Sequence, residues 1–307
     1  MAMKKGGDEG QRHDGVAREY AGEAMSYLDR IRICQVFNPD DYRPFRVDGG
    51  RVGWLRPALA EALGRHPDIF HVFANAVELA PDIVGFAGRS RAVAHVVRSL
   101  VEDGILDDWR DEAYAVGVRF AEPLFTIDRG AVPPLGVRGY GVHLNGYVRR
   151  GEEIHMWIGR RSPTKRMAPN KLDQLVAGGQ PAGLTPRENL IKEAGEEASI
   201  PREMVEKARP VGAITYCTER EDGLRNDVLF VYDLELPKDF TPHNADGELS
   251  GFELLPIGAV MDLVRTTEEF KFNCALVVID FLIRHGLIAP EHPEYLDLIA
   301  GLRSGQA

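Results

Sequence analysis

Residues 178–200, GGQPAGLTPRENLIKEAGEEASI, constrain the fold of this chain more than any other stretch. Thr185 suits the N-cap of a helix, Pro186 suits its first turn, and Glu188 suits the third position of a capping box. Pro201 cannot continue a helix, so we expect the helix to end just before it. The sequence therefore specifies a glycine-bearing loop followed by a helix with a defined start and end.

This helix presents carboxylates on one face and apolar side chains on the other. At about 100° per residue, Glu193, Glu196 and Glu197 share one third of the helical circumference. Such carboxylates repel one another and, late in a helix, oppose its dipole. Their oxygen atoms suit Mg²⁺, with Mn²⁺ as the alternative. A solvated acidic face is the simpler interpretation of the spacing alone, but the loop and the cap favour a metal site.

The loop, the cap and the Glu-x-x-Glu-Glu spacing together resemble the Nudix box, with three departures. Counted from Gly178, Leu184 stands where the box usually has Glu, Lys192 where it has Arg, and Ser199 where it has Gly. The first two departures remove both ends of what looks in the family like an ion pair that orients the helix. Glu188, four residues before Lys192, is interpreted as the replacement partner.

Other stretches are similar to a branch of the Nudix hydrolases related to the C-terminal part of fungal thiamine pyrophosphokinase. In the second half they are YGVHLNGYV (140–148), MWIGRRSPTKRMAPNKLDQLVAGG (156–179), DGELSGFELLPI (246–257) and FNCALVVIDFLIRHGLI (272–288). Residues 27–55 are similar to the N-terminal module of this branch. The resemblance implies an α+β protein, with a Nudix-type α/β/α sandwich and mixed sheet preceded by a smaller α+β domain. It also implies hydrolysis of thiamine diphosphate, or its oxidised analogues, to the monophosphate.

Local patterns agree with an α+β organisation. We expect a mobile tail at residues 1–16, a substrate-recognition module at 17–130 and the Nudix hydrolase domain at 131–307, joined through the Pro- and Gly-containing segment 121–136. Helical patterns cover 17–33, 56–65, 89–103 and 273–285, and strand patterns cover the hairpin 43–54 and residues 138–148, 153–160, 210–218 and 226–236.

Basic residues ahead of the box are the second chemical feature: Arg160, Arg161, Lys165, Arg166 and Lys171. In a diphosphate site, cationic groups neutralise the non-bridging oxygens. We expect substrate contacts from Arg160, Lys171, Gly178 and Gly179. A solvated loop is the alternative for any single basic residue.

The expected mechanism is metal-assisted hydrolysis of a diphosphate. Glu193 and Glu197 serve as catalytic residues as well as ligands. The family often supplies a further Glu from a loop in this part of the fold, and Glu248 is preferred for that role over Glu219, Glu221 and Asp222. The first domain would help to recognise the organic part of the substrate, with Trp54 or Phe45 as stacking candidates and core packing as their simpler role.

Three alternatives stay open. The substrate could be another nucleoside diphosphate derivative. A prenyl diphosphate isomerase on the same fold would need a catalytic cysteine, for which Cys217 is the candidate. A non-catalytic ligand-binding module is suggested by Leu184 and Lys192.

Composition narrows the class of partner. A net charge of −10 and a pI near 5.5 argue against nucleic acid, so we expect a small-molecule diphosphate as the partner and leave a homodimer open. Cys34, Cys217 and Cys274 lie far apart in apolar settings, which predicts buried free thiols. Without a signal-like or roughly 18-residue apolar run, we expect a cytoplasmic protein with no membrane partner.

Overall fold

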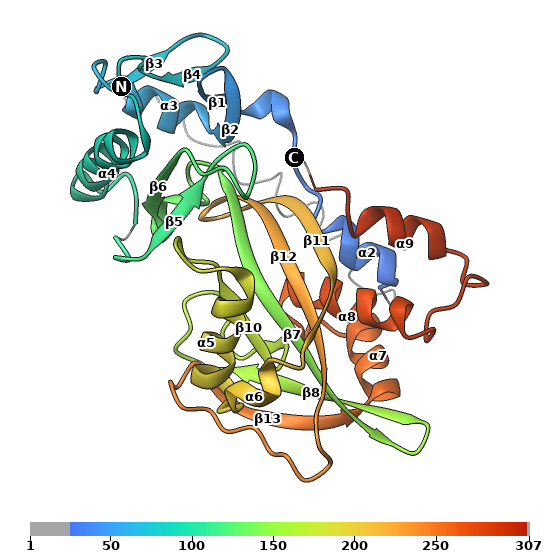
Figure 1. Ribbon diagram of the computed structural model, residues 1–307. Coiled ribbons are helices and arrows are strands. Elements are labelled where there is room, and N and C mark those ends of the chain that lie inside the picture. Colours follow the sequence, from blue (N-terminus) through green and yellow to red (C-terminus); the bar gives the residue numbers. More distant parts are fainter. Residues whose placement is uncertain (1–24, 108, 306–307) are drawn as a thin grey trace, which may run out of the picture.

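The computed structural model describes residues 25–107 and 109–305 as an α+β protein with mixed sheets, which confirms the expected class (Figure 1). The predicted tail at 1–16 and the first part of the predicted helix at 17–33 lie outside the described residues. In the described part of the chain, no helix is long and apolar enough to span a membrane.

The first module is built on a four-stranded sheet of order β2-β1-β4-β3. The predicted hairpin is confirmed: β1 and β2 pair antiparallel, and Asp48 and Gly49 form its turn with φ of 51° and 78°. The elements are β1 (Arg43–Val47), β2 (Gly50–Leu55), β3 (Phe70–Val72), β4 (Val77–Leu79), the antiparallel pair β5 (Ala113–Val116) and β6 (Phe125–Asp128), and the helices η1 (Pro39–Asp41), α3 (Pro57–Leu63), α4 (Phe86–Glu102) and η2 (Arg129–Ala131).

The second unit is built on a seven-stranded sheet with the path β11-β12-β7-β8-β13, in which β10 also pairs with β7 and β9 with β8. The β12–β7 pair is parallel and the other pairs are antiparallel, so the sheet is mixed. Its strands are β7 (Arg138–Arg150), β8 (Glu153–Arg161), β9 (Leu172–Asp173), β10 (Val176–Gly179), β11 (Arg209–Arg220), β12 (Gly223–Glu235) and β13 (Leu249–Pro256).

Helices cover both faces of this sheet, as the sandwich requires. On one face, Leu190 and Ala194 of a helix pack with Leu144 of β7, whereas on the other Val277 packs with Met156 of β8. The first layer holds α5 (Pro186–Ala198) and α6 (Arg202–Val205), and the second holds α2 (Tyr27–Arg32), α7 (Ile257–Thr266), α8 (Phe272–Arg284) and α9 (Tyr295–Gly301).

Helix α2 belongs to the core of the second unit, although the sequence assigns residues 17–130 to the first. Tyr27, Ile31 and Cys34 are buried in the same cluster as α8, and Arg30 Nε donates to the backbone oxygen of Val264 at 2.7 Å. The chain therefore enters the second unit, leaves it to build the first module, and returns.

The two units are joined by a small buried cluster rather than by a loose linker. Trp54 packs with Cys217 and Leu224 across the junction, and its backbone N–H donates to Leu135 at 3.1 Å. Segment 121–136, expected as linker, contains β6 and η2 and contributes to the first core. Phe45 is fully buried in that core and Trp54 in the junction, so core packing is confirmed for both rings.

Candidate metal and phosphate site

Helix α5 has the local structure that its sequence predicts. Glu188 N–H donates to Thr185 Oγ1 at 3.2 Å, and Thr185 N–H donates to Glu188 Oε2 at 2.8 Å, which forms the capping box. Ser199 ends the helix with φ of 52°, a left-handed conformation that explains why the box usually has Gly there. Its hydroxyl donates to the backbone oxygen of His243 at 2.8 Å, which holds this conformation.

The predicted ion pair between Glu188 and Lys192 is wrong. The Glu188 carboxylate accepts hydrogen bonds from the N–H and the hydroxyl of Thr185 at the start of the helix. It is therefore directed away from Lys192, which lies one turn further along. Lys192 instead contacts the box carboxylates, with Nζ 3.2 Å from Glu193 Oε1 and 2.7 Å from Glu196 Oε2. Lys192 therefore forms ion pairs with two of the three box glutamates and forms none with Glu188 at the start of the helix.

The three box glutamates lie in different environments. Glu197, placed by the sequence on the carboxylate face, is 4% exposed, and its Oε2 accepts the backbone N–H of Ala177 in β10 at 2.8 Å. Burial raises the pKa of Glu197 well above its usual value and also raises the pKa of Glu193, whose side chain is mostly buried. Glu196 is exposed. The helix thus places the carboxylates of Glu197 and Glu193 against β10, whereas that of Glu196 is solvated and paired with Lys192.

The glycines of the loop make room for this arrangement. A methyl group on Gly178 would lie 2.4 Å from Cγ and Cδ of Glu193, so the absence of a side chain lets that carboxylate lie over β10. A methyl group on Gly179 would lie 1.8 Å from the hydroxyl of Tyr114. Gly178 and Gly179 therefore have a steric role next to the carboxylates, in addition to the substrate contact that the sequence suggests.

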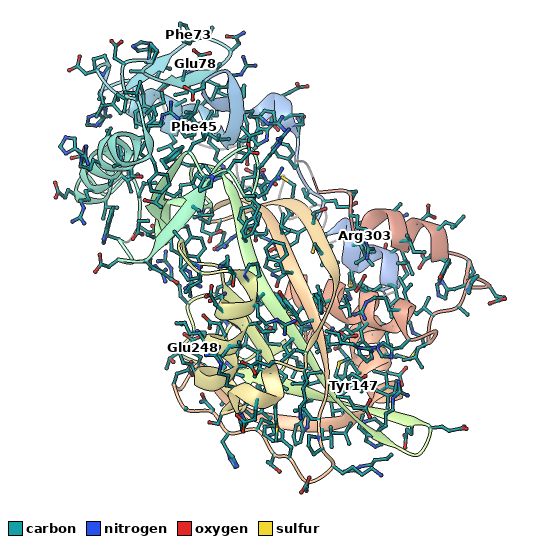
Figure 2. The ribbon with its side chains drawn as sticks, viewed as in Figure 1. Phe45, Phe73, Glu78, Tyr147, Glu248 and Arg303 are labelled. Carbon is teal, nitrogen blue, oxygen red and sulfur yellow. The ribbon has the colours of Figure 1, made fainter. Side chains whose placement is uncertain are left out.

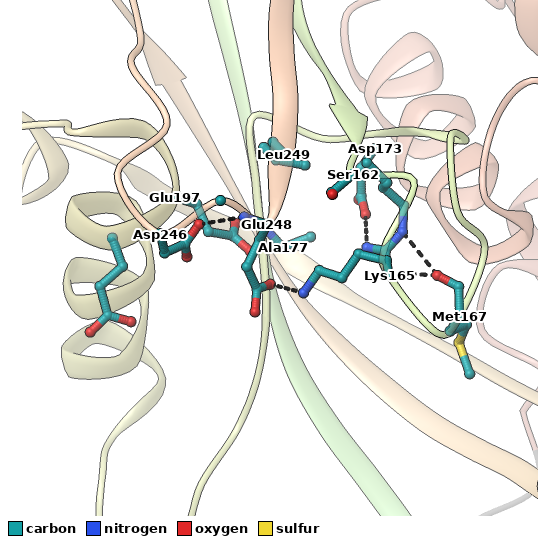
Figure 3. A network of polar contacts seen from close by, with 12 residues as sticks. Ser162, Lys165, Met167, Asp173, Ala177, Glu197, Asp246, Glu248 and Leu249 are labelled. Carbon is teal, nitrogen blue, oxygen red and sulfur yellow. Dashed lines mark hydrogen bonds and ion pairs between the residues drawn. The ribbon is translucent and has the colours of Figure 1, made fainter.

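Glu248 reaches the same region from the loop between β12 and β13. This loop is held on the C-terminal end of α5 by backbone hydrogen bonds. The N–H of His243 donates to the backbone oxygen of Ala198 at 3.1 Å, and the N–H of Ala245 donates to the backbone oxygen of Glu196 at 3.3 Å. The charge of Glu248 contributes to the raised pKa of Glu193 and Glu197. Figure 3 shows Glu248 paired with Lys165, close to Glu197 and Ala177.

Of the basic residues, the structure brings Lys165 rather than Arg160 or Lys171 to the carboxylates. Arg160 shares the strand face of Met156 and Ile158, which is packed by α7 and α8, and its Nη1 lies 3.2 Å from Glu269. Lys171 Nζ donates to the backbone oxygen of Glu268 at 2.6 Å. The alternation of side chains along a strand puts Arg160 on the face of Met156, but only the packing of the helices shows that this face is covered.

One contributor to the site, Tyr114, was missed by the sequence analysis of function. Tyr114 comes from β5 of the first module, is 6% exposed, and its hydroxyl has no hydrogen-bond partner among the described residues. Burial raises the pKa of this phenol. The module is fixed here because Ala182 N–H, just after the glycine loop, donates to Ala113 at 2.8 Å. A contact between segments so far apart in the chain leaves no local signal.

A second polar cluster lies inside the sheet. Among the described residues, His143, Asp173 and Cys274 have potential ligand atoms within 4.8 Å of one another. The Asp173 carboxylate is already paired with Arg161 at 2.8 Å and accepts the Cys274 thiol at 2.8 Å. His143 Nδ1 lies 2.8 Å from Gln174 Oε1. These contacts describe a hydrogen-bonded core, in which the His143 side chain is buried.

The box carboxylates fit a hard divalent cation. Among the residues that the structure describes, Glu197 is buried with one N–H donor on its carboxylate, and Glu193 is partly buried beside it. Buried carboxylates that receive so little compensation are stabilised by a cation between them. Oxygen donors of this kind match Mg²⁺ or Mn²⁺.

Comparisons with known proteins identify relatives over nearly the whole chain. Residues 26–139 match a family described as a domain of unknown function (DUF4743). Nudix hydrolase 24, chloroplastic, of Arabidopsis thaliana is 44% identical over 295 residues, covering 93% of this chain and 80% of the relative. Nudix hydrolase 20, chloroplastic, of the same plant is 40% identical over 304 residues, covering 94% and 81%.

A solved structure is also similar to part of this chain. The Ap4A hydrolase binary complex of C. elegans is 14% identical and covers 48% of this chain and 96% of that chain, with a TM-score of 0.36.

Proposed function

Since the chain belongs to the Nudix hydrolase family and is a hydrolase, we propose that it converts thiamine diphosphate, or an oxidised analogue, to the monophosphate and inorganic phosphate. The observation that carries the diphosphate part is the buried Glu197 beside Glu193 at the glycine loop. The thiamine part is supported by the resemblance over both units and by the contact of the first module with that loop.

The box glutamates Glu193, Glu196 and Glu197 would hold Mg²⁺, with Mn²⁺ as the alternative. When bound, the ion supplies charge neutralisation of the diphosphate and a lower pKa for water. Lys192 keeps Glu193 and Glu196 in place through its two ion pairs, and Ala177 fixes Glu197 through its N–H. One side chain, Lys192, and one backbone group, Ala177 N–H, would thus fix the three carboxylates at which the diphosphate binds.

Glu248 is the proposed general base, because its carboxylate lies near Glu197 but comes from a loop rather than from the helix that carries the metal ligands. A water oxygen forms a bond to the terminal phosphorus, its proton passes to the Glu248 carboxylate, and the bridging P–O bond breaks to release the monophosphate. Lys165, paired with Glu248, is placed to neutralise a phosphate oxygen.

The burial of Cys217 argues against the isomerase alternative. This thiol packs against Trp54 and Leu224 at the junction of the two units, and burial raises its pKa to about 12. A thiol held neutral in a closed apolar cluster is unsuited to proton transfer on a prenyl chain. Another diphosphate substrate remains the second candidate, and a substrate panel decides between them.

The test is a turnover assay with Mg²⁺ on the full chain, using thiamine diphosphate, its oxidised analogue, ADP-ribose and a nucleoside triphosphate. We expect the highest kcat/KM for a thiamine compound, with inorganic phosphate as the second product. A clear preference for ADP-ribose would overturn the thiamine assignment and leave the Nudix hydrolase assignment intact. No turnover of any member of the panel would support the non-catalytic alternative.

A matched pair of variants tests the carboxylate assignment. Glu197→Gln keeps the shape that accepts the Ala177 N–H but removes the charge, so we expect nearly complete loss of turnover in a folded protein. Glu206→Gln is the control, because Glu206 is exposed and pairs only with Arg202 in the part of the chain that the structure describes. Near wild-type turnover of Glu197→Gln at saturating Mg²⁺ would contradict the mechanism.

A further inference from the structure

An aromatic cluster lies at the junction of the two units and is formed by Phe120, Tyr140 and Phe230. The ring of Phe120 is 4.7 Å from that of Tyr140 and 5.0 Å from that of Phe230, between centroids. Tyr140 and Phe230 are nearly parallel, with an interplanar angle of 9°. Phe120 is 40% exposed, and the other two rings are half-buried. Phe120 is inclined at 55° to Tyr140 and at 61° to Phe230, so it packs on these two rings and presents its own exposed surface to solvent.

The aromatic cluster lies on the same face of the sheet as the box helix. Phe230 packs against the core that contains Leu190 of α5. Tyr140 lies two residues before Val142 in β7 and therefore points to the same face, and Val142 is part of that core. The backbone oxygen of Tyr140 accepts the N–H of Gln180 at 2.8 Å, immediately after the glycine loop. The cluster therefore borders the loop that separates it from the carboxylates.

Strand pairing gives the separation between the backbone of Phe230, in the aromatic cluster, and that of Gly178, beneath Glu193. Phe230 pairs with Val142 of β7, and Val142 pairs on its other side with Gly178, over which Glu193 lies. The backbones of Phe230 and Gly178 are therefore two strand spacings apart, which is about 10 Å. That distance suits a substrate whose diphosphate is joined through a short linker to a ring.

The first module positions Phe120 firmly. Phe120 lies in the short loop between β5 and β6, which is closed by Leu124 N–H donating to Val116 at 2.8 Å. A methyl group on Gly117 would lie 2.4 Å from the backbone oxygen of Glu122, so the loop is tight. The same hairpin carries Tyr114 to Gly179. One hairpin of the first module thus contacts the site at two points.

We propose that the aromatic cluster binds the planar heterocyclic part of the diphosphate substrate by stacking, with Phe120 as the contribution of the first module. This rests on the proposed diphosphatase function and adds the residues that select the organic group. Aromatic faces bind flat rings and attract cationic ones. Phe45 and Trp54 are buried and therefore cannot stack on a substrate, whereas Phe120 is exposed and can.

Single substitutions at Phe120 test the proposal. We expect Phe120→Ala and Phe120→Leu to lower kcat/KM for thiamine diphosphate about tenfold, the effect of losing one stacking contact. Neither should change kcat/KM for methyl diphosphate, which has no ring. Leu keeps an apolar side chain at the junction but is not flat, so it separates stacking from packing. Phe120→Tyr should restore the wild-type value.

Phe73→Ala is the matched control, because Phe73 is 49% exposed in the same module but lies at its far tip, remote from Glu248 (Figure 2). An equal loss on thiamine diphosphate and on methyl diphosphate, or full activity of Phe120→Leu, would overturn the proposal. If the wild-type protein prefers a different ring-bearing diphosphate, that compound replaces thiamine diphosphate in the comparison. If the wild-type protein hydrolyses no diphosphate, the proposed function fails first and this inference fails with it.

Discussion

Replacement of Gly178 by alanine is the sharpest perturbation of the site. The new methyl group would lie 2.4 Å from two carbons of Glu193 and 2.6 Å from its Oε2, whereas carbon atoms in contact are usually about 3.5 to 4.0 Å apart. Either the backbone or the Glu193 side chain must therefore move by about 1 Å. The side chain is the softer of the two, so we expect the carboxylate to swing away from β10.

The expected result is a large loss of activity with a small loss of stability. A displacement of about 1 Å at a reacting centre can lower the rate on the order of 100-fold. Overpacking typically lowers the free energy of unfolding by about 1 to 3 kcal/mol, and a side chain that moves away keeps the loss near the lower value. The measurements are kcat/KM with Mg²⁺ and the free energy of unfolding from urea titration.

Gly195→Ala in the same helix is the control. A methyl group there meets no heavy atom within 4 Å, and alanine is favoured over glycine in a helix interior by about 1 kcal/mol. We expect higher stability and unchanged kcat/KM. Wild-type kcat/KM in Gly178→Ala would refute the argument that close packing on β10 positions Glu193.

Two further predictions concern buried polar groups. Tyr114→Phe removes a buried hydroxyl without a partner in the described residues, so the free energy of unfolding should rise by about 1 kcal/mol in thermal or urea unfolding; a fall would show that the hydroxyl is bound. Burial lowers the pKa of His143 from 6.5 to about 4. The neutral ring therefore stabilises the fold above pH 6.5, by up to about 3 kcal/mol, and this stabilisation is lost as the pH falls toward 4. His143→Gln should reduce the difference in unfolding free energy between pH 7 and pH 4.5, and an unchanged difference would contradict the assignment.

The sequence predicts the parts of the site that depend on neighbouring residues. The capping box at Thr185 and the hairpin turn at Asp48 follow from local side-chain and backbone chemistry, and both are found in the structure. The burial of Glu197 was not predicted, because helical periodicity places it on the acidic face and only the position of Ala177 in β10 shows that this face is covered. Periodicity defines a face of an element, whereas packing decides what the face contacts.

Contacts between the units were beyond local prediction for the same reason. The Pro- and Gly-containing segment 121–136 reads as a linker because its composition is typical of turns. In the structure, part of it forms the second strand of the hairpin that carries Tyr114 and Phe120 to the site. Which surface a hairpin meets depends on long-range packing, for which a single sequence gives no periodic signal.

The position of α2 has a consequence for biosynthesis. This helix has six residues, too few to be stable in isolation, and its partners in α8 and α9 are made only after the whole first module. At ordinary synthesis rates the segment waits on the order of tens of seconds before its binding surface emerges from the ribosome. The hydrolase unit thus completes its core only after the first module has been synthesised. For the same reason, deletion of residues 1–130 would remove part of that core and could not isolate the contribution of the first module.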